Sequence, residues 1–256
     1  MLTIFPIPAF SDNYIWCLHR SDDDYCAIVD PGDAKPVMHT LERMGLKLHS
    51  ILITHHHHDH TGGIAELVKK YQPEVVGPKK SQIAHLTHKV VEGDQIYLSF
   101  LDTTFNVLEI PGHTLDHIAY VSDKLVFCGD TLFSSGCGRL FEGTPSQMVL
   151  SLTKIAQLPP NTLLYCAHEY TQANLKFAEA VEPNNEAIQS RIREVAAMRA
   201  DNKPSLPSTL ESELRTNPFL RCDQTDVINA ASAWCGETLR EHVDVFAALR
   251  RWKDGF

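Results

Sequence analysis

A run of histidines near residue 55 supplies residue types that bind metal ions. The segment 54–60 reads Thr-His-His-His-His-Asp-His and follows a short apolar run. If the backbone stays extended through His57, the side chains of His55 and His57 point to the same side, because side chains alternate along an extended chain. These two histidines could share one metal ion, and Asp59 and His60, after the chain turns, could face a second. The chemistry expected is hydrolysis by a metal-activated water, which needs no serine or cysteine nucleophile.

Three more metal-binding residue types follow apolar, strand-like runs. They are His113 after Ile-Pro-Gly, Asp130 after Phe-Cys-Gly and His168 after Tyr-Cys-Ala. A single histidine after a strand is usually an ordinary hydrogen-bonded residue. Four strand ends that carry such residues instead predict one shared site, because α/β folds place their sites at the carboxyl ends of strands. Asp30, in Val-Asp-Pro-Gly, is open to two interpretations: it orients a ligand histidine from behind, or it is an acidic turn residue.

The elements that must position these residues alternate up to residue 168. Three- and four-residue spacing of apolar side chains predicts helices at 35–44, 64–71 and 146–158. The alternation predicts an α/β fold. Short apolar and β-branched runs predict strands at 14–18, 26–29, 51–53, 75–76, 105–110, 118–121, 125–128 and 163–166.

The pattern changes after His168, where no strand is expected. We therefore place a domain boundary near residue 170, with a catalytic domain at 1–170 and a helical domain at 171–256. Prolines separate the predicted helices of the second domain. These helices are expected at 171–180, 185–200, 208–214, 225–235 and 238–252.

The composition of the chain disfavours some classes of partner and indicates which cellular compartment suits it. The 23 lysines and arginines are outnumbered by 32 aspartates and glutamates, which disfavours a nucleic-acid partner. The apolar N-terminus lacks a basic flank and is interrupted by Pro6 and Pro8, and no apolar run is long enough for a membrane span. Seven cysteines without a C-x-x-C pair suit a reducing compartment. We expect a soluble, cytoplasmic monomer with no membrane partner.

The chain resembles the metallo-β-lactamase superfamily and, within it, the hydroxyacylglutathione hydrolases, also called the glyoxalase II family. The resemblance extends from Asp12 to Phe256. It implies an αββα sandwich followed by a helical substrate-binding domain. The motifs that carry it are Thr54-His55-x-His57-x-Asp59-His60, Pro111-Gly-His113-Thr114, Gly129-Asp130-Thr131-Leu-Phe133, Gly136-Cys-Gly-Arg139, Ala167-His168-Glu-Tyr170 and Arg250-Arg-x-Lys253-Asp254-x-Phe256.

The resemblance implies two divalent metal ions, each with three ligands of its own and joined by a shared carboxylate. Histidine and carboxylate ligands fit zinc best, and iron and manganese also suit them. The ligands implied are His55, His57 and His113 for one ion, Asp59, His60 and His168 for the other, and Asp130 as the bridge.

The activity implied is hydrolysis of S-D-lactoylglutathione and related 2-hydroxyacyl glutathione thioesters to glutathione and D-lactate, a step of methylglyoxal detoxification. A metal-bridging hydroxide would attack the thioester carbonyl. Asp59 and Asp130 would be the catalytic carboxylates, with Asp59 holding the hydroxide and taking its proton. Asp59 could equally act only as a ligand.

The resemblance assigns glutathione binding to four residues with cationic or hydroxyl side chains. Arg250 and Lys253 are three residues apart and can share a helix face, although basic residues in a last helical turn are also favoured by the helix dipole. Phe141 stands where some relatives have tyrosine, so it is left out of the binding set. The four residues are Arg139, Tyr170, Arg250 and Lys253.

Other functions on the same fold remain open from sequence. They include a different hydrolase or a persulfide dioxygenase acting on a glutathione conjugate, and a binding module without turnover. Many zinc-dependent β-lactamases have cysteine where this chain has Asp130, and the persulfide dioxygenases lack a counterpart of the helical domain. A nuclease would need a basic surface, which the charge balance disfavours.

Overall fold

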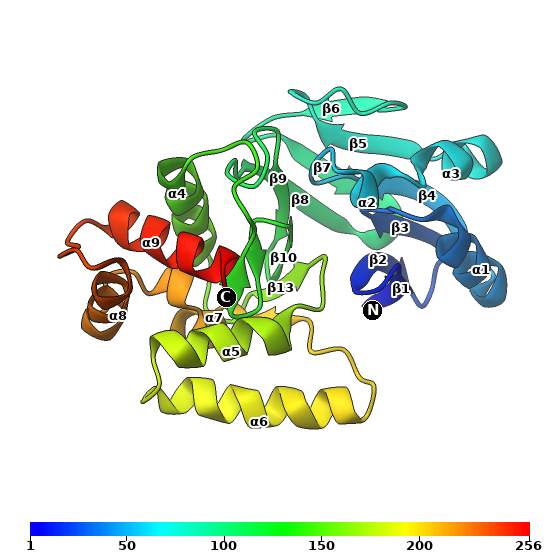
Figure 1. The fold of residues 1–256 in the computed structure, drawn as a ribbon. Helices are drawn as coiled ribbons and strands as arrows, with labels where there is room; N and C mark the ends of the chain where they lie inside the picture. Colours follow the sequence, from blue (N-terminus) through cyan, green and yellow to red (C-terminus); the bar gives the residue numbers. More distant parts are fainter. The chain divides into compact units, whose positions relative to one another are not determined.

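A computed structural model describes residues 1–256, which divide into two compact units. The first unit comprises residues 1–109 and 116–129, and the second comprises residues 110–115 and 130–256 (Figure 1). None of the helices is both long enough and apolar enough to cross a membrane.

A six-stranded sheet forms the larger part of the first unit. Its first three strands are antiparallel, and β3 to β6 are parallel. In order across the sheet, the strands are β1 (Leu2–Ala9), β2 (Asn13–Arg20), β3 (Tyr25–Val29), β4 (Lys47–Leu52), β5 (Glu74–Pro78) and β6 (His88–Val90).

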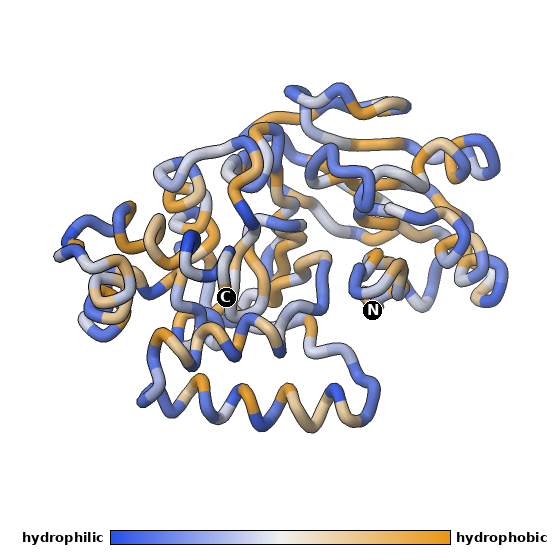
Figure 2. Tube along the Cα trace, viewed as in Figure 1, coloured by the Kyte–Doolittle hydropathy of each residue, from blue (hydrophilic) through white to orange (hydrophobic).

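Two amphipathic helices, α1 (Ala34–Met44) and α3 (Ile64–Tyr71), connect the parallel strands and pack on this sheet. Val37 and Leu67 join Ile51 of β4 in one buried cluster. The hydropathy colouring shows β5 as largely hydrophobic, as expected for a strand in a parallel sheet (Figure 2). The short helix α2 (His58–Thr61) lies between β4 and α3 and includes the end of the histidine run.

A four-stranded antiparallel array completes the first unit. It comprises β7 (Gln95–Leu98), β8 (Thr103–Glu109), β9 (Ile118–Ser122) and β10 (Leu125–Gly129), and a 3₁₀ turn (Ser99–Leu101) joins β7 to β8. The buried Tyr120 hydroxyl on β9 donates to the carbonyl oxygens of Ile53 and Val76, at 2.8 and 3.2 Å. The backbone N–H of Ile118 donates to the carbonyl of Thr54 at 2.9 Å. The start of the histidine run is therefore held by β9 as well as by its own strand.

The second unit is mainly helical. Helices α5 and α6 lie side by side (Figure 1) and bury Leu175, Ala178, Ile188 and Val195. Their bounds, with those of the unit's other elements in chain order, are β11 (Leu132–Phe133), β12 (Gly136–Cys137), α4 (Pro145–Ala156), β13 (Leu163–Cys166), α5 (Thr171–Val181), α6 (Glu186–Ala200), β14 (Ser208–Thr209), α7 (Leu210–Thr216), a 3₁₀ turn (Pro218–Leu220), α8 (Thr225–Cys235) and α9 (His242–Asp254).

The structure confirms the predicted strands and most of the predicted helices. It also adds strands that were not predicted, among them β6, β7, β11 and β12, and it differs from expectation in the following places. The expectation of no strand after His168 is wrong, because β14 pairs antiparallel with β13 before α7 begins. The last helix begins at His242 and not at residue 238. Leu2–Ala9 forms a strand despite Pro6 and Pro8, since β1 is the edge of its sheet, where proline is tolerated. The domain boundary near residue 170 stays a prediction.

Candidate metal centre

The histidine run follows β4 after Ile53 and Thr54, and His55 and His57 face each other there. The Nε2 atom of His55 lies 3.1 Å from Nδ1 of His57. The backbone is still extended at His57, with φ −58° and ψ 146°, and turns into α2 at His58. Side-chain alternation along the extended segment thus places both nitrogen atoms on one side, where they can share one cation.

Asp30 orients two histidines of the run, His60 by direct contact and His55 through the hydroxyl of Thr54. Its Oδ2 lies 3.1 Å from Nδ1 of His60 and accepts a 2.7 Å hydrogen bond from the hydroxyl of Thr54. Because that hydroxyl donates to Asp30, it accepts from Nδ1 of His55, 3.0 Å away. Both rings therefore carry their proton on Nδ1 and keep the Nε2 lone pair for a cation. Of the two interpretations of Asp30, the structure favours the orienting one.

Asp59 lies at the first turn of α2, with its Oδ2 3.4 Å from Nε2 of His60. The side-chain amide of Asn13 donates to the same oxygen at 3.1 Å. A Cβ atom on Gly32 would lie 1.9 Å from the carbonyl oxygen of Asp59, so only glycine allows this close approach. Asp59 and His60 thus offer a carboxylate oxygen and an imidazole nitrogen to one cation.

The other two histidines of the run point elsewhere. Nδ1 of His56 lies 2.9 Å from a carboxylate oxygen of Asp116, and the His56 ring is 39% exposed. His58 is exposed at the start of α2. Neither belongs to the pairs described above.

In the second unit a buried carboxylate lies against two imidazoles. Oδ2 of Asp130 is 3.5 Å from Nε2 of His113 and 3.3 Å from Nε2 of His168. Nδ1 of His113 donates to the carbonyl of Arg139 at 2.8 Å, which leaves Nε2 to accept a cation. The Asp130 carboxylate therefore offers an oxygen donor beside two imidazole nitrogens.

The donor chemistry of both units fits divalent metal ions. The described donors are imidazole nitrogens and carboxylate oxygens. The rings of His55, His60 and His113 are each oriented by a hydrogen bond at Nδ1, the nitrogen that does not face the cation. The histidine and aspartate clusters therefore indicate divalent metal binding.

The structure brings three of the four predicted substrate-binding residues near Asp254 on α9. Arg139 is 64% exposed, with Nε 3.6 Å from the Asp254 carboxylate. Arg250 is only 5% exposed, donates to the carbonyl of Cys137 at 2.8 Å and lies 3.0 Å from Asp254. Lys253 donates to the carbonyl of Ala173 at 3.3 Å. Burial, and then the charges of Arg250 and Arg139, lower the pKa of Lys253.

Tyr170, the fourth of these residues, stacks on His168 with ring centroids 4.8 Å apart and planes 8° apart. The exposed Phe141 ring lies edge-on to His113, at 5.2 Å. Each aromatic ring therefore covers one histidine of the second unit. Whether they contact substrate stays a prediction.

The contact of Asn13 with Asp59, 46 residues away in the chain, was not predicted from the sequence. Nor was the role of Thr54 as the link between Asp30 and His55. The only sequence signal for Asn13 is its place in the Asp-Asn-Tyr segment where the family resemblance begins.

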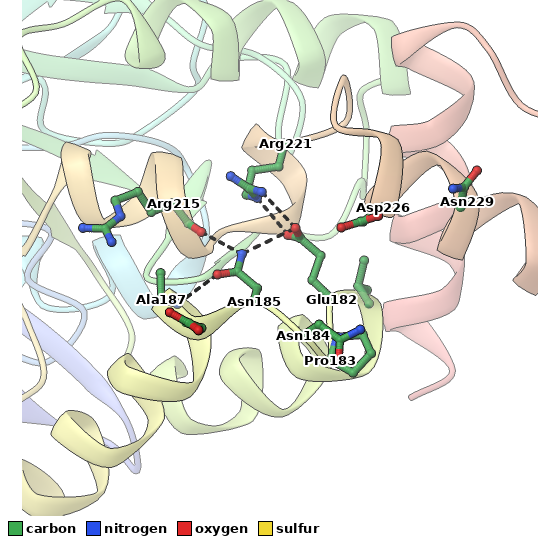
Figure 3. A pocket seen from close by; sticks show the side chains of 11 residues that line it. Glu182, Pro183, Asn184, Asn185, Ala187, Arg215, Arg221, Asp226 and Asn229 are labelled. Carbon is green, nitrogen blue, oxygen red and sulfur yellow. Dashed lines mark hydrogen bonds and ion pairs between the residues drawn. The ribbon is translucent and has the colours of Figure 1, made fainter.

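A hollow of about 530 Å³ in the second unit is lined by none of the predicted metal ligands, and Figure 3 shows the residues that line it. At its wall, Arg221 holds the buried carboxylate of Glu182 through Nε and Nη2, at 2.8 and 2.9 Å. The amide of Asn185 donates to the carbonyl of Arg215 at 3.0 Å. These polar groups bind one another, which indicates a structural role.

We expect Arg221→Leu to lower the free energy of unfolding by about 3 kcal/mol, because it leaves the Glu182 carboxylate buried without its cation. Denaturant unfolding followed by circular dichroism measures this change. Arg215→Ala, at an exposed position on the same hollow, is the control and should cost less than about 0.5 kcal/mol. Equal stabilities of the two variants would contradict a structural role for the ion pair.

Comparison with known proteins finds relatives over the whole length of the chain. Residues 13–168 match the family described as metallo-beta-lactamase superfamily, and residues 169–256 match the family described as hydroxyacylglutathione hydrolase C-terminus. The chain is 52% identical to a hydroxyacylglutathione hydrolase of Photobacterium profundum and 48% identical to one of Nitrosomonas eutropha, and each alignment covers 100% of both chains.

Among solved structures, ETHE1 from Myxococcus xanthus is similar, with a TM-score of 0.66 and 23% identity over 99% of this chain and 98% of that one. That likeness supports the fold alone. Together with the superfamily match, it confirms the predicted metallo-β-lactamase fold with a helical C-terminal region.

Proposed function

We propose that the chain, which belongs to the hydroxyacylglutathione hydrolase family of the metallo-β-lactamase superfamily, hydrolyses S-D-lactoylglutathione and related 2-hydroxyacyl glutathione thioesters. The products are glutathione and a free 2-hydroxy acid such as D-lactate. The observation that carries the proposal is the full-length match to hydrolases of this name, which includes the C-terminal helical region.

We propose that the chain holds two divalent ions, most simply zinc, with iron and manganese as the other candidates. When bound, such ions lower the pKa of a coordinated water toward neutrality and polarise a carbonyl oxygen. All seven proposed ligands lie within residues 13–168, the range of the superfamily match. The proposed ligands are His55, His57 and His113 for one ion, Asp59, His60 and His168 for the other, and Asp130 for both.

The chain's own groups would orient these ligands and accept the proton that the attacking water releases. Asp30 keeps the proton of His60 on Nδ1, and Thr54 does the same for His55. Oδ2 of Asp59 is the proposed acceptor of the proton released as water attacks the thioester. Asn13 fixes that oxygen with a hydrogen bond of 3.1 Å. The leaving group is a thiolate, which needs no dedicated general acid because thiols have a pKa of about 8.5.

The two carboxylates of the glutathione moiety call for cationic partners. We propose that Arg139 and Lys253 bind them and that Tyr170 supplies a hydroxyl donor beside His168. Arg250 contributes to the same binding region from a buried position, where it holds the Cys137 carbonyl. Arginine at position 139 can engage a carboxylate through two parallel hydrogen bonds, which lysine cannot do.

The proposal includes a boundary near residue 170 between a catalytic domain and a substrate-binding domain. The two family matches meet at residues 168 and 169, which supports it. We propose that the protein acts as a cytoplasmic monomer without nucleic-acid or membrane partners. Its net charge of −9 and its seven free cysteines, six of them buried, are in keeping with that.

The proposed function is tested with purified, zinc-loaded protein and S-D-lactoylglutathione. Thioester loss and free thiol are followed together, and bound metal is counted by elemental analysis. We expect one thiol for each thioester consumed and two metal ions per chain. Metal-loaded protein that releases no thiol would defeat the proposal.

We expect KM for S-D-lactoylglutathione to rise with pH at a lower pH than an ordinary lysine would give. The pKa of Lys253 is lowered from 10.5, so its ammonium group loses the proton, and with it the attraction for a carboxylate, below that value. In Lys253→Arg the rise should disappear, because a guanidinium stays charged throughout. Initial rates corrected for alkaline thioester hydrolysis measure it. The exposed Lys203→Arg is the control, and identical profiles for all three proteins would refute the assignment.

A further inference from the structure

The short hairpin of β11 and β12 is linked, through the chain or by a side-chain contact, to every proposed metal ligand of the second unit. It begins two residues after Asp130 and ends two residues before Arg139, whose carbonyl accepts from Nδ1 of His113. The ring of Phe133 in β11 meets the His168 ring edge-on, at 5.8 Å and 90°. A displacement of this hairpin would therefore move all three ligands.

Close packing transmits the position of the hairpin to Asp130. The backbone N–H of Gly138 donates to the carbonyl of Thr131 at 3.3 Å, which ties the two ends of the hairpin together. A Cβ atom on Gly138 would lie 2.0 Å from the carbonyl oxygen of Asp130 and 3.0 Å from Nδ1 of His113. The backbone after β12 is thus in direct contact with two of the ligands.

The tip of the hairpin, Ser134–Ser135, is buried and held by the carboxylate of Glu213 on α7. Oε2 of Glu213 accepts from the backbone N–H of Ser135 at 2.6 Å, and Oε1 accepts from the hydroxyl of Ser134 at 3.0 Å. Ser135 has φ 56°, a left-handed conformation that costs free energy for a residue other than glycine. A charge-assisted hydrogen bond offsets such a cost.

Two amide side chains complete the support of the tip. Asn217 donates to the carbonyls of Phe133 and Gly136, at 3.1 and 2.9 Å, and to Glu213 at 3.2 Å. Asn174 of α5 donates to the carbonyl of Ser134 at 3.0 Å. Glu213 and Asn217 are fully buried, so the network binds the hairpin and not solvent.

We propose that Glu213 is a positioning residue: by fixing the tip of the β11–β12 hairpin, its carboxylate sets the placement of Asp130, His113 and His168 for metal binding. The inference rests on the proposed function, because it takes these three residues to be metal ligands. The carboxylate of Glu213 binds Ser134, Ser135 and Asn217 and is not itself proposed as a metal ligand. Burial raises its pKa and the hydrogen bonds it accepts oppose that shift, so those donors are what makes a carboxylate tolerable there.

The test compares Glu213→Gln and Glu213→Ala with Glu211→Gln, an exposed residue of the same helix. Zinc transfer to a colorimetric chelator is followed well below the unfolding temperature of each metal-free protein, which circular dichroism gives. We expect zinc to leave the alanine variant about 10 to 100 times faster, the range typical of lost ligand support. Glutamine retains an acceptor for the Ser135 N–H, so its effect should be smaller but clear, and kcat should fall in the same order.

A purely structural role predicts another result. Folded Glu213→Gln and Glu213→Ala proteins that release zinc at the rate of Glu211→Gln would overturn the proposal, even if their unfolding temperatures were lower. If the alanine variant does not fold, the glutamine variant decides by the same criterion. Failure of the proposed function is a separate result: the unaltered protein would then bind no zinc or hydrolyse no thioester.

Discussion

Asp130→Ala is expected to reduce bound zinc from two ions to at most one and to lower kcat by about a thousandfold. Asp130 is the proposed ligand common to both ions, and its Oδ2 lies within 3.5 Å of two imidazole nitrogens. Stabilisation of developing charge by metal ions amounts to several kcal/mol, and about 4 kcal/mol corresponds to a factor of a thousand.

Elemental analysis and steady-state rates with S-D-lactoylglutathione measure the two effects in one preparation. Asp223→Ala removes an exposed carboxylate of the same unit and should change neither. Circular dichroism shows whether the variant is folded. A folded Asp130→Ala protein that keeps two zinc ions would disprove the bridging role, and full turnover would disprove the catalytic role.

Asp30→Asn is expected to weaken zinc binding by about 10 to 100 times while leaving the fold intact. Asn is a matched replacement because it tolerates the left-handed conformation of Asp30, whose φ is 52°. Its carbonyl oxygen must stay with the N–H of Thr54, which donates at 2.8 Å, so the NH₂ group takes the place of Oδ2. That group donates to Nδ1 of His60, which forces the proton of His60 onto Nε2 and blocks the nitrogen that would bind metal.

Competition with a chelator of known affinity measures the loss, and the imidazole nitrogen resonances of the metal-free protein report the change of tautomer directly. Asp123→Asn, in an exposed turn, is the control. Unchanged zinc affinity together with an unchanged His60 tautomer would show that Asp30 is only a turn residue. An affinity loss without the tautomer change would place the effect elsewhere.

Local patterns predicted the parts of the centre that depend on neighbours in sequence. The pairing of His55 with His57 follows from side-chain alternation, which also directs His56 to the other side of the chain. The sequence left open whether Asp30 orients a histidine, because its contact with His60 requires a left-handed backbone at Asp30 and the packing of two strands. The contact of Asn13 with Asp59 depends on a similar long-range approach.

In the fold, too, features set by neighbours in sequence were predicted and features set by distant residues were not. Helix α3 and helix α8 have the bounds that apolar spacing predicts. Strands β1 and β14 are among those that were not predicted. Prolines interrupt the apolar pattern of β1, and β14 is two residues long and depends on its pairing with β13. The Glu213 network likewise leaves no signal in sequence, since it joins residues 78 and 79 positions apart.

The buried hydroxyl of Tyr120 has a consequence for redesign of this scaffold. Burial raises its pKa well above the ordinary value, so it remains a hydrogen-bond donor wherever the protein is folded. Its two acceptors, the carbonyls of Ile53 and Val76, are therefore served by a hydroxyl whose protonated form burial favours. Loop exchange or circular permutation of the first unit should leave this tyrosine untouched, because its hydroxyl fixes where the histidine loop starts.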